Sequence, residues 1–165
     1  MSRSETFVFG KIPASLAEFS ALPEAELKNP FQAAALTVLA ICRYCDNPQS
    51  GIEMLNFLKG PQPLSTYEQQ FLRDRLTGKK YLPYSFFEGA SVQNNYTPSE
   101  PLTIIILDDP YSYAEEGYAK LLIKSSGADQ VRPIKLRRKG QDQWFLWEQF
   151  LLSSIREPVA ADPWA

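Results

Sequence analysis

The stretch that decides the fold is YAKLLIKSSGADQVRPIKLRRKGQDQWFLW, residues 118–147. It holds three runs whose side chains suit strands, at residues 118–124, 131–138 and 143–147. Ser-Ser-Gly-Ala-Asp and Lys-Gly-Gln-Asp separate these runs, and both are turn-type sequences of hairpin length. The stretch therefore predicts an antiparallel meander.

A further strand is predicted upstream of the meander. Residues 102–107, LTIIIL, are rich in β-branched side chains and lie between Pro101 and the turn sequence Asp-Asp-Pro. The Pro-, Tyr- and Asn-rich residues 79–101 before them indicate a connecting segment, with one short strand around residues 84–87.

The N-terminal half predicts helices. Residues 30–45 follow an Asn-Pro start and are apolar on nearly all sides, which is typical of a buried central helix. Further start signals predict short helices from Ser15 and over residues 22–28, and longer ones over residues 48–58 and 65–78.

The segregation of helices and strands favours an α+β fold, with N-terminal helices packed on a C-terminal antiparallel β-meander sheet. Phe150, Leu151 and Ile155 predict a short C-terminal helix, and Trp164 is expected to dock on the body of the protein. The 165 residues, of which 44% are apolar, suffice for one core, so we expect a single domain over residues 1–165.

Composition excludes several functional classes. The chain has no histidine, which rules out Ser-His-Asp catalysis, His-ligated zinc and an imidazole pH switch. The formal charge of −2 argues against a protein that coats nucleic acid. We expect a cytoplasmic protein without a membrane span, because the N-terminus has no secretory pattern and the longest apolar run is too short.

Two further motifs are interpreted as structural. Cys42 and Cys45 have redox-motif spacing but lie near the end of a helix, so we read them as small buried apolar residues. The four carboxylates within residues 108–116 lack the EF-hand spacing, so a solvated loop is favoured over a Ca²⁺ or Mg²⁺ site. No glycine-rich phosphate loop is present, and we predict no metal and no cofactor.

The basic stretch is the most informative candidate site. Seven basic residues lie between Lys120 and Lys139 against one acidic residue. Strand alternation places Lys120 and Lys124 on one face of their strand, and Lys135 and Arg137 on one face of the next. These four residues form the predicted binding face for an anionic partner. The alternative is a solubility device that prevents sheet edges from aggregating.

Aromatic side chains extend this candidate. Trp144 and Trp147 fall on opposite faces of the last strand, so one ring is expected on the face away from the core. Exposed rings beside basic strands resemble a platform for single-stranded nucleic acid, although the aromatic and glycine pattern of known RNA-binding sheets is absent.

The segments KLRRKG and WFLWEQ, together with DPWA at the end, resemble an uncharacterised bacterial family of about this length. That resemblance implies no chemistry, because the family has no assigned activity. The order of helices before strands more loosely resembles the nuclear-transport-factor-2-like group, which implies a curved antiparallel sheet. The acids and histidines that line pockets in that group have no counterparts here, so no catalytic residue is transferred.

Three hypotheses about function follow. The leading one is a non-catalytic cytoplasmic binding domain that contacts an anionic partner or another protein through its basic face. The second is a small-molecule pocket protein or hydrolase-like enzyme with a cavity between helices and concave sheet, using Glu115, Glu116 or Glu148. The third is a structural subunit that binds a second copy of itself, and the oligomeric state stays open.

Overall fold

The computed structural model describes residues 2–165 and contains one five-stranded antiparallel sheet in the order β1-β2-β3-β4-β5. Consecutive strands are neighbours throughout, so the predicted meander is confirmed. The strands are β1 (Ser4–Phe9), β2 (Leu102–Leu107), β3 (Tyr118–Ile123), β4 (Arg132–Lys139) and β5 (Gln143–Gln149).

The helices begin at side chains that cap them. Asn29, Asn47 and Ser65 each accept a hydrogen bond from a backbone N–H in the first turn of the helix that follows. The helices are α1 (Leu16–Ser20), α2 (Pro30–Asp46), α3 (Pro48–Lys59), α4 (Thr66–Leu76) and α5 (Tyr81–Tyr84), with short 3-10 helices η1 (Pro23–Glu26) and η2 (Val159–Ala161).

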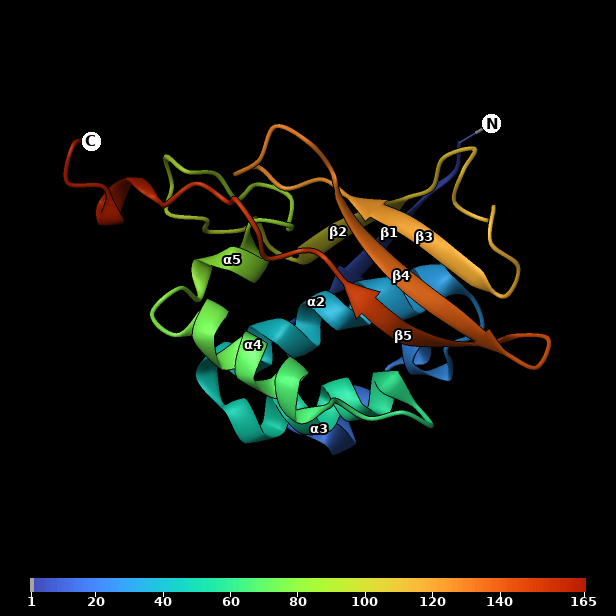
Figure 1. Cartoon of the computed structure of the whole chain (residues 1–165). Helices are drawn as coiled ribbons and strands as arrows, with labels where there is room; N and C mark the ends of the chain where they lie inside the picture. Colours follow the sequence, from blue (N-terminus) through green and yellow to red (C-terminus); the bar gives the residue numbers. More distant parts are fainter. Residues whose placement is uncertain (1) are drawn as a thin grey trace.

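Helix α2 lies at the centre of the molecule and is buried on nearly all sides, as its composition predicts. It contacts β2, β3, β4 and β5 on one side and α3 on the other (Figure 1). Alternate residues of every strand point toward it and are buried. They are Phe7, Phe9, Leu102, Ile104, Ile106, Ala119, Leu121, Ile123, Ile134, Leu136 and Leu146. We call this side of the sheet its inner face.

The close approach of α3 to α2 depends on a glycine. A Cβ atom added to Gly51 would lie 2.3 Å from the Cα atom of Tyr44, far inside van der Waals contact. Gly51 therefore allows the two helices to pack closely directly after the tight turn at Asn47.

Strands β1 and β5 are the two edges of the sheet, and neighbouring groups satisfy part of the free backbone of β5. The Trp144 N–H donates to the Leu27 carbonyl at 2.9 Å, and the Lys59 Nζ donates to the Trp147 carbonyl at 2.9 Å. Trp147 is the extra residue of a β-bulge, because Leu136 pairs with Leu146 whereas Lys135 pairs with Glu148. These contacts obstruct pairing with a further strand along this edge.

Strand β1 was missed by the sequence analysis. Its Phe7 and Phe9 are buried on the inner face, and its pairing with β2 brings Phe7 opposite Ile104. The strand predicted around residues 84–87 is wrong, because residues 81–84 form helix α5 and the next residues continue in turns.

The predicted C-terminal helix is also wrong. Residues 150–158 run without helical structure across the molecule, and Leu151, Leu152 and Ile155 are buried in that extended path. Ser154 has a φ of 55°, which interrupts any helix there. Trp164 does not dock on the body, since 93% of its surface is exposed.

Among residues 2–165, no helix is both long enough and apolar enough to cross a membrane.

Candidate functional site

The structure brings three of the four predicted basic residues onto one face. Lys120 in β3 lies directly opposite Lys135 in β4, and Arg137 follows on the same face of β4. Lys124 is exposed and lies just after the last residue of β3, outside the ladder. This side of the sheet, which we call the outer face, points away from α2 (Figure 1).

Two aromatic rings join these cations on the outer face. The Tyr118 and Trp147 rings meet edge to face with 5.8 Å between their centroids. The Lys135 Nζ lies 4.5 Å from the Tyr118 centroid, and the Arg137 guanidinium lies 4.7 Å from the Trp147 centroid. We call Tyr118, Lys120, Lys135, Arg137 and Trp147 the outer-face cluster. One tryptophan ring was predicted on the face away from the core, and Trp147 lies there, but the contacts between rings and cations were not predicted.

Acidic groups balance only part of the positive charge. The Lys135 Nζ forms an ion pair of 2.7 Å with Glu115, and Glu148 is its partner across the β4–β5 ladder. Within residues 2–165, Lys120 and Arg137 form no ion pair. Because like charges across strands repel, the opposed pair Lys120 and Lys135 makes this face favourable for an anion.

Of the three carboxylates named for an enzyme, Glu148 of β5 lines a hollow between the edge strand and α4, whereas Glu115 and Glu116 line neither that hollow nor the one beside it. The inner face packs directly on α2, and apolar side chains fill the space between them. Glu115 and Glu116 lie in the exposed loop before β3, and Glu148 is exposed on β5. Side chains therefore fill the space under the sheet, and Glu148 borders a hollow at the edge of the sheet instead.

The prediction that both cysteines are buried is confirmed for Cys42, whereas Cys45 is only partly buried. Both thiols are free, and Cys42 is fully buried. Burial raises the pKa of Cys42 well above its ordinary value, and burial together with Asp46 raises the pKa of Cys45 to about 12. Neither thiol is activated as a nucleophile. Over residues 2–165, no three His, Cys, Asp or Glu side chains are grouped to hold a metal ion.

The acidic loop after β2 uses its carboxylates for local structure. Asp108 accepts a hydrogen bond from the Arg3 backbone N–H at 2.6 Å, and Asp109 accepts one from the Tyr111 N–H at 2.8 Å. These bonds tie the loop to the start of β1 and close its own turn.

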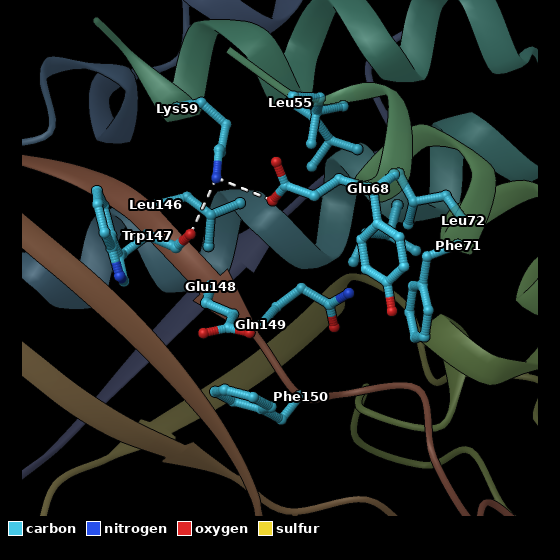
Figure 2. Close-up of a pocket in the computed structure, with 13 residues that line it drawn as sticks. Leu55, Lys59, Glu68, Phe71, Leu72, Leu146, Trp147, Glu148, Gln149 and Phe150 are labelled. Carbon is cyan, nitrogen blue, oxygen red and sulfur yellow. Dashed lines mark hydrogen bonds and ion pairs between the residues drawn. The ribbon is translucent and has the colours of Figure 1, made fainter. Parts of the chain in front are cut away.

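Two hollows flank the outer-face cluster where β5 meets the helices. The first has a volume of about 270 Å³, lies between β5 and α4, and is mainly apolar, with Leu64, Tyr67, Phe71 and Phe150 in its wall. We call it the apolar hollow, and Figure 2 shows its labelled residues. The second has a volume of about 290 Å³ and is lined by Arg137, Arg138, Lys139 and Phe145 among others. We call it the basic hollow.

Lys59 separates the two hollows and borders both of them. Its side chain is only 6% exposed, and its Nζ donates to Glu68 Oε2 at 3.0 Å and to the Trp147 carbonyl at 2.9 Å (Figure 2). Burial of Glu68 raises its pKa, but hydrogen bonds from the Ser65 N–H and from Lys59 outweigh burial, so the pKa is lowered. Lys59 thus anchors α4 and the edge strand to the end of α3.

Lys59 was not predicted as a site residue, and it lies directly after the helix predicted over residues 48–58. A signal was present, because Lys59 follows the buried Leu55 by four residues and therefore shares its helix face. A lysine on the inward face of an amphipathic helix requires a partner, and Glu68 supplies one.

Comparison with known proteins supports the expected resemblance to an uncharacterised family. No curated protein and no solved structure matches the chain, and the looser likeness to the nuclear-transport-factor-2-like group is not confirmed. One family does match, over residues 11–159, which include α2, strands β2 to β5 and both hollows. The chain belongs to the family described as Domain of unknown function (DUF6935).

Proposed function

We propose that this chain is a non-catalytic binding domain whose outer face contacts an anionic partner. The observation that carries the proposal is the outer-face cluster, in which Lys120 and Arg137 form no ion pair within residues 2–165 and Lys120 opposes Lys135 across the ladder. The packing of the N-terminal helices on the inner face supports it, because the outer face stays accessible. A cytoplasmic setting belongs to the proposal, and the two free cysteines support it.

The geometry of the rings favours some anionic partners over others. Arg137 lies over the face of Trp147, and Lys135 lies over the face of Tyr118. A stacked base would have to displace these cations from the ring faces. We therefore favour a partner that presents carboxylates or phosphates to the cations over single-stranded nucleic acid that stacks its bases.

The test compares two triple variants that lose the same amount of charge. The first, K120Q/K135Q/R137Q, neutralises the outer-face cluster, and the second, K11Q/K79Q/K80Q, neutralises three exposed lysines elsewhere. Inorganic polyphosphate serves as the anionic probe, and its affinity is measured by isothermal titration calorimetry at low salt. Thermal unfolding curves check that both variants stay folded.

We expect the outer-face variant to bind polyphosphate about tenfold or more weakly than the wild type, because charge-assisted contacts are lost. The matched variant should bind within about twofold of the wild type. An equal loss in both variants would show that net charge alone attracts the probe. An absence of binding by the wild type would leave the basic strands as a solubility device and overturn the proposal.

A further inference from the structure

The two hollows share a wall. Leu146 and Trp147 of β5, together with Lys59, line both of them, so the hollows meet at the β-bulge. Figure 2 shows the apolar side of this junction, with Phe71 and Phe150 at its border and Lys59 between Glu68 and Trp147. The junction therefore places an apolar surface and a basic surface next to one another.

Four cations line the basic hollow, and within residues 2–165 acidic residues pair with only one of them. Arg137, Arg138 and Lys139 follow one another at the end of β4, and in the described chain, residues 2–165, none of them takes part in an ion pair. Lys59 adds a fourth cation to the wall, but Glu68 already neutralises it. An anionic group that enters this hollow meets three cations without competing carboxylates.

The apolar hollow exposes side chains that are usually covered. Tyr67 is 78% exposed, Phe150 is 43% exposed, and Phe71 packs on the core from the same wall. Exposed aromatic side chains gathered at a concave surface indicate a site for an apolar group. The polar groups of this hollow include Gln149 and Glu148 of β5 and Glu68 of α4, so the anionic part of a ligand is favoured on the basic side of the junction.

We propose that the joined hollows bind a small amphiphilic anion, a molecule in which an aromatic ring or short alkyl chain carries a carboxylate, phosphate or sulfonate. The apolar group lies against Tyr67, Phe71 and Phe150, and the anionic group lies against Arg138 and Lys139. Volumes of about 270 and 290 Å³ suit a free small molecule. The inference rests on the proposed function only through Arg137 and Trp147, which border both sites.

The test uses three probes that separate the two halves of the ligand. The dye 8-anilinonaphthalene-1-sulfonate carries both an aromatic system and an anionic group, and its fluorescence rises in apolar surroundings. N-phenyl-1-naphthylamine has the same rings without the sulfonate, and methanesulfonate has the sulfonate without the rings. Dye titrations give affinity and stoichiometry for the folded full chain, and methanesulfonate is added as a competitor.

Four variants assign the binding to the two hollows. R138Q/K139Q neutralises the basic hollow, and Y67S/F150S removes exposed rings from the apolar hollow, where loss of folding is not expected. K79Q/K80Q is the charge-matched control for the cations, because these two exposed lysines line neither hollow and lie outside the outer-face cluster. Y111S is the control for the rings, because Tyr111 is an equally exposed aromatic residue in the loop after β2.

We expect one molecule of the sulfonated dye to bind per chain, about tenfold or more tightly than its neutral analogue. R138Q/K139Q should lower the affinity for the sulfonated dye to that for the neutral dye and leave the affinity for the neutral dye unchanged. Y67S/F150S should lower the affinity for both dyes about tenfold. Both controls should stay within about twofold of the wild type, and methanesulfonate alone should not compete at the same concentration.

Equal affinity for the two dyes, or an unchanged advantage in R138Q/K139Q, would overturn the proposal. Binding of an acidic, tryptophan-containing peptide by a chain that binds neither dye would overturn it as well, in favour of a protein partner. The double variant K120Q/K135Q keeps the two proposals distinguishable, because Lys120 and Lys135 line neither hollow. Polyphosphate binding that is unchanged in K120Q/K135Q would overturn the proposed function, whatever the dyes show.

Discussion

Replacement of Lys59 with methionine is expected to destabilise the fold by about 2–4 kcal/mol. Methionine keeps an unbranched side chain in the buried path but removes both hydrogen bonds of the Nζ. The Trp147 carbonyl then loses its partner at the bulge, which costs about 1–3 kcal/mol for a buried group. Glu68 loses a charge-assisted bond, but it is 34% exposed, so water recovers part of that loss.

Urea unfolding followed by tryptophan fluorescence measures this loss. With a denaturant slope of roughly 1–3 kcal/mol per molar, the midpoint of K59M should fall by about 1–2 M urea. The matched control is Lys11→Met, because Lys11 pairs with Glu18 at 3.2 Å while its side chain is 75% exposed. That surface pair should contribute less than about 1 kcal/mol.

A double-mutant cycle with Glu68→Gln separates the ion pair from the carbonyl contact. Glutamine can keep the capping box with Ser65 but carries no charge for Lys59. We expect a coupling free energy of roughly 1 kcal/mol or more between the two substitutions. A K59M loss no larger than that of K11M would refute the reasoning that Lys59 anchors the edge strand.

Three further predictions concern stability and reactivity. Gly51→Ala should destabilise the protein by about 2 kcal/mol or more in urea unfolding, because the new Cβ atom would lie 2.3 Å from the Tyr44 Cα atom. Gly10→Ala is the control, because a Cβ atom there would meet nothing within 4 Å, and it should change the unfolding free energy little. The pKa of Glu68 is lowered in the folded protein, so its charge contributes stability above the ordinary pKa of about 4.3, and this stability is lost as the pH falls through the pKa of the folded state. The unfolding free energy of E68Q should therefore fall less between pH 7 and pH 3 than that of the wild type. Iodoacetamide at pH 8 should alkylate Cys45, whose pKa is about 12, about tenfold or more slowly than free cysteine, and a rate equal to that of free cysteine would contradict the burial of this thiol.

Local sequence signals were sufficient to predict most of the elements. The Asn-Pro starts before α2 and α3 and the Ser65 capping box before α4 predicted helices that the structure contains. The meander strands were predicted because their turns are short and their alternation is regular. Such signals act within a few residues, so they do not depend on the rest of the fold.

The wrong predictions concern segments whose conformation depends on distant contacts. β1 forms because β2 is available across almost a hundred residues, and Phe7 and Phe9 fill the end of the inner face. Residues 150–155 have an amphipathic pattern, but Arg132 binds the Ser153 carbonyl at 3.0 Å, and Leu151 is buried without helical structure. Tertiary contacts decide both cases.

The candidate site divides in the same way. Strand alternation alone predicted that Lys135 and Arg137 share a face, and the β3–β4 register then brought Lys120 to that face. The two hollows were beyond prediction, because the β-bulge at Trp147 and the approach of α4 to β5 arise only in the folded chain. Lys59 could have been predicted as a site residue, because its place in the sequence puts it on the inward side of α3.

The salt dependence of polyphosphate binding tests the central claim most directly. The affinity of the wild type and of K120Q/K135Q/R137Q is measured from low to physiological salt, with K11Q/K79Q/K80Q as the charge-matched control. We predict that the slope of log affinity against log salt becomes shallower by roughly two to three in the outer-face variant and stays at the wild-type value in the control. Equal slopes in both variants would contradict the account, because the outer face would then make no direct contact with the anion.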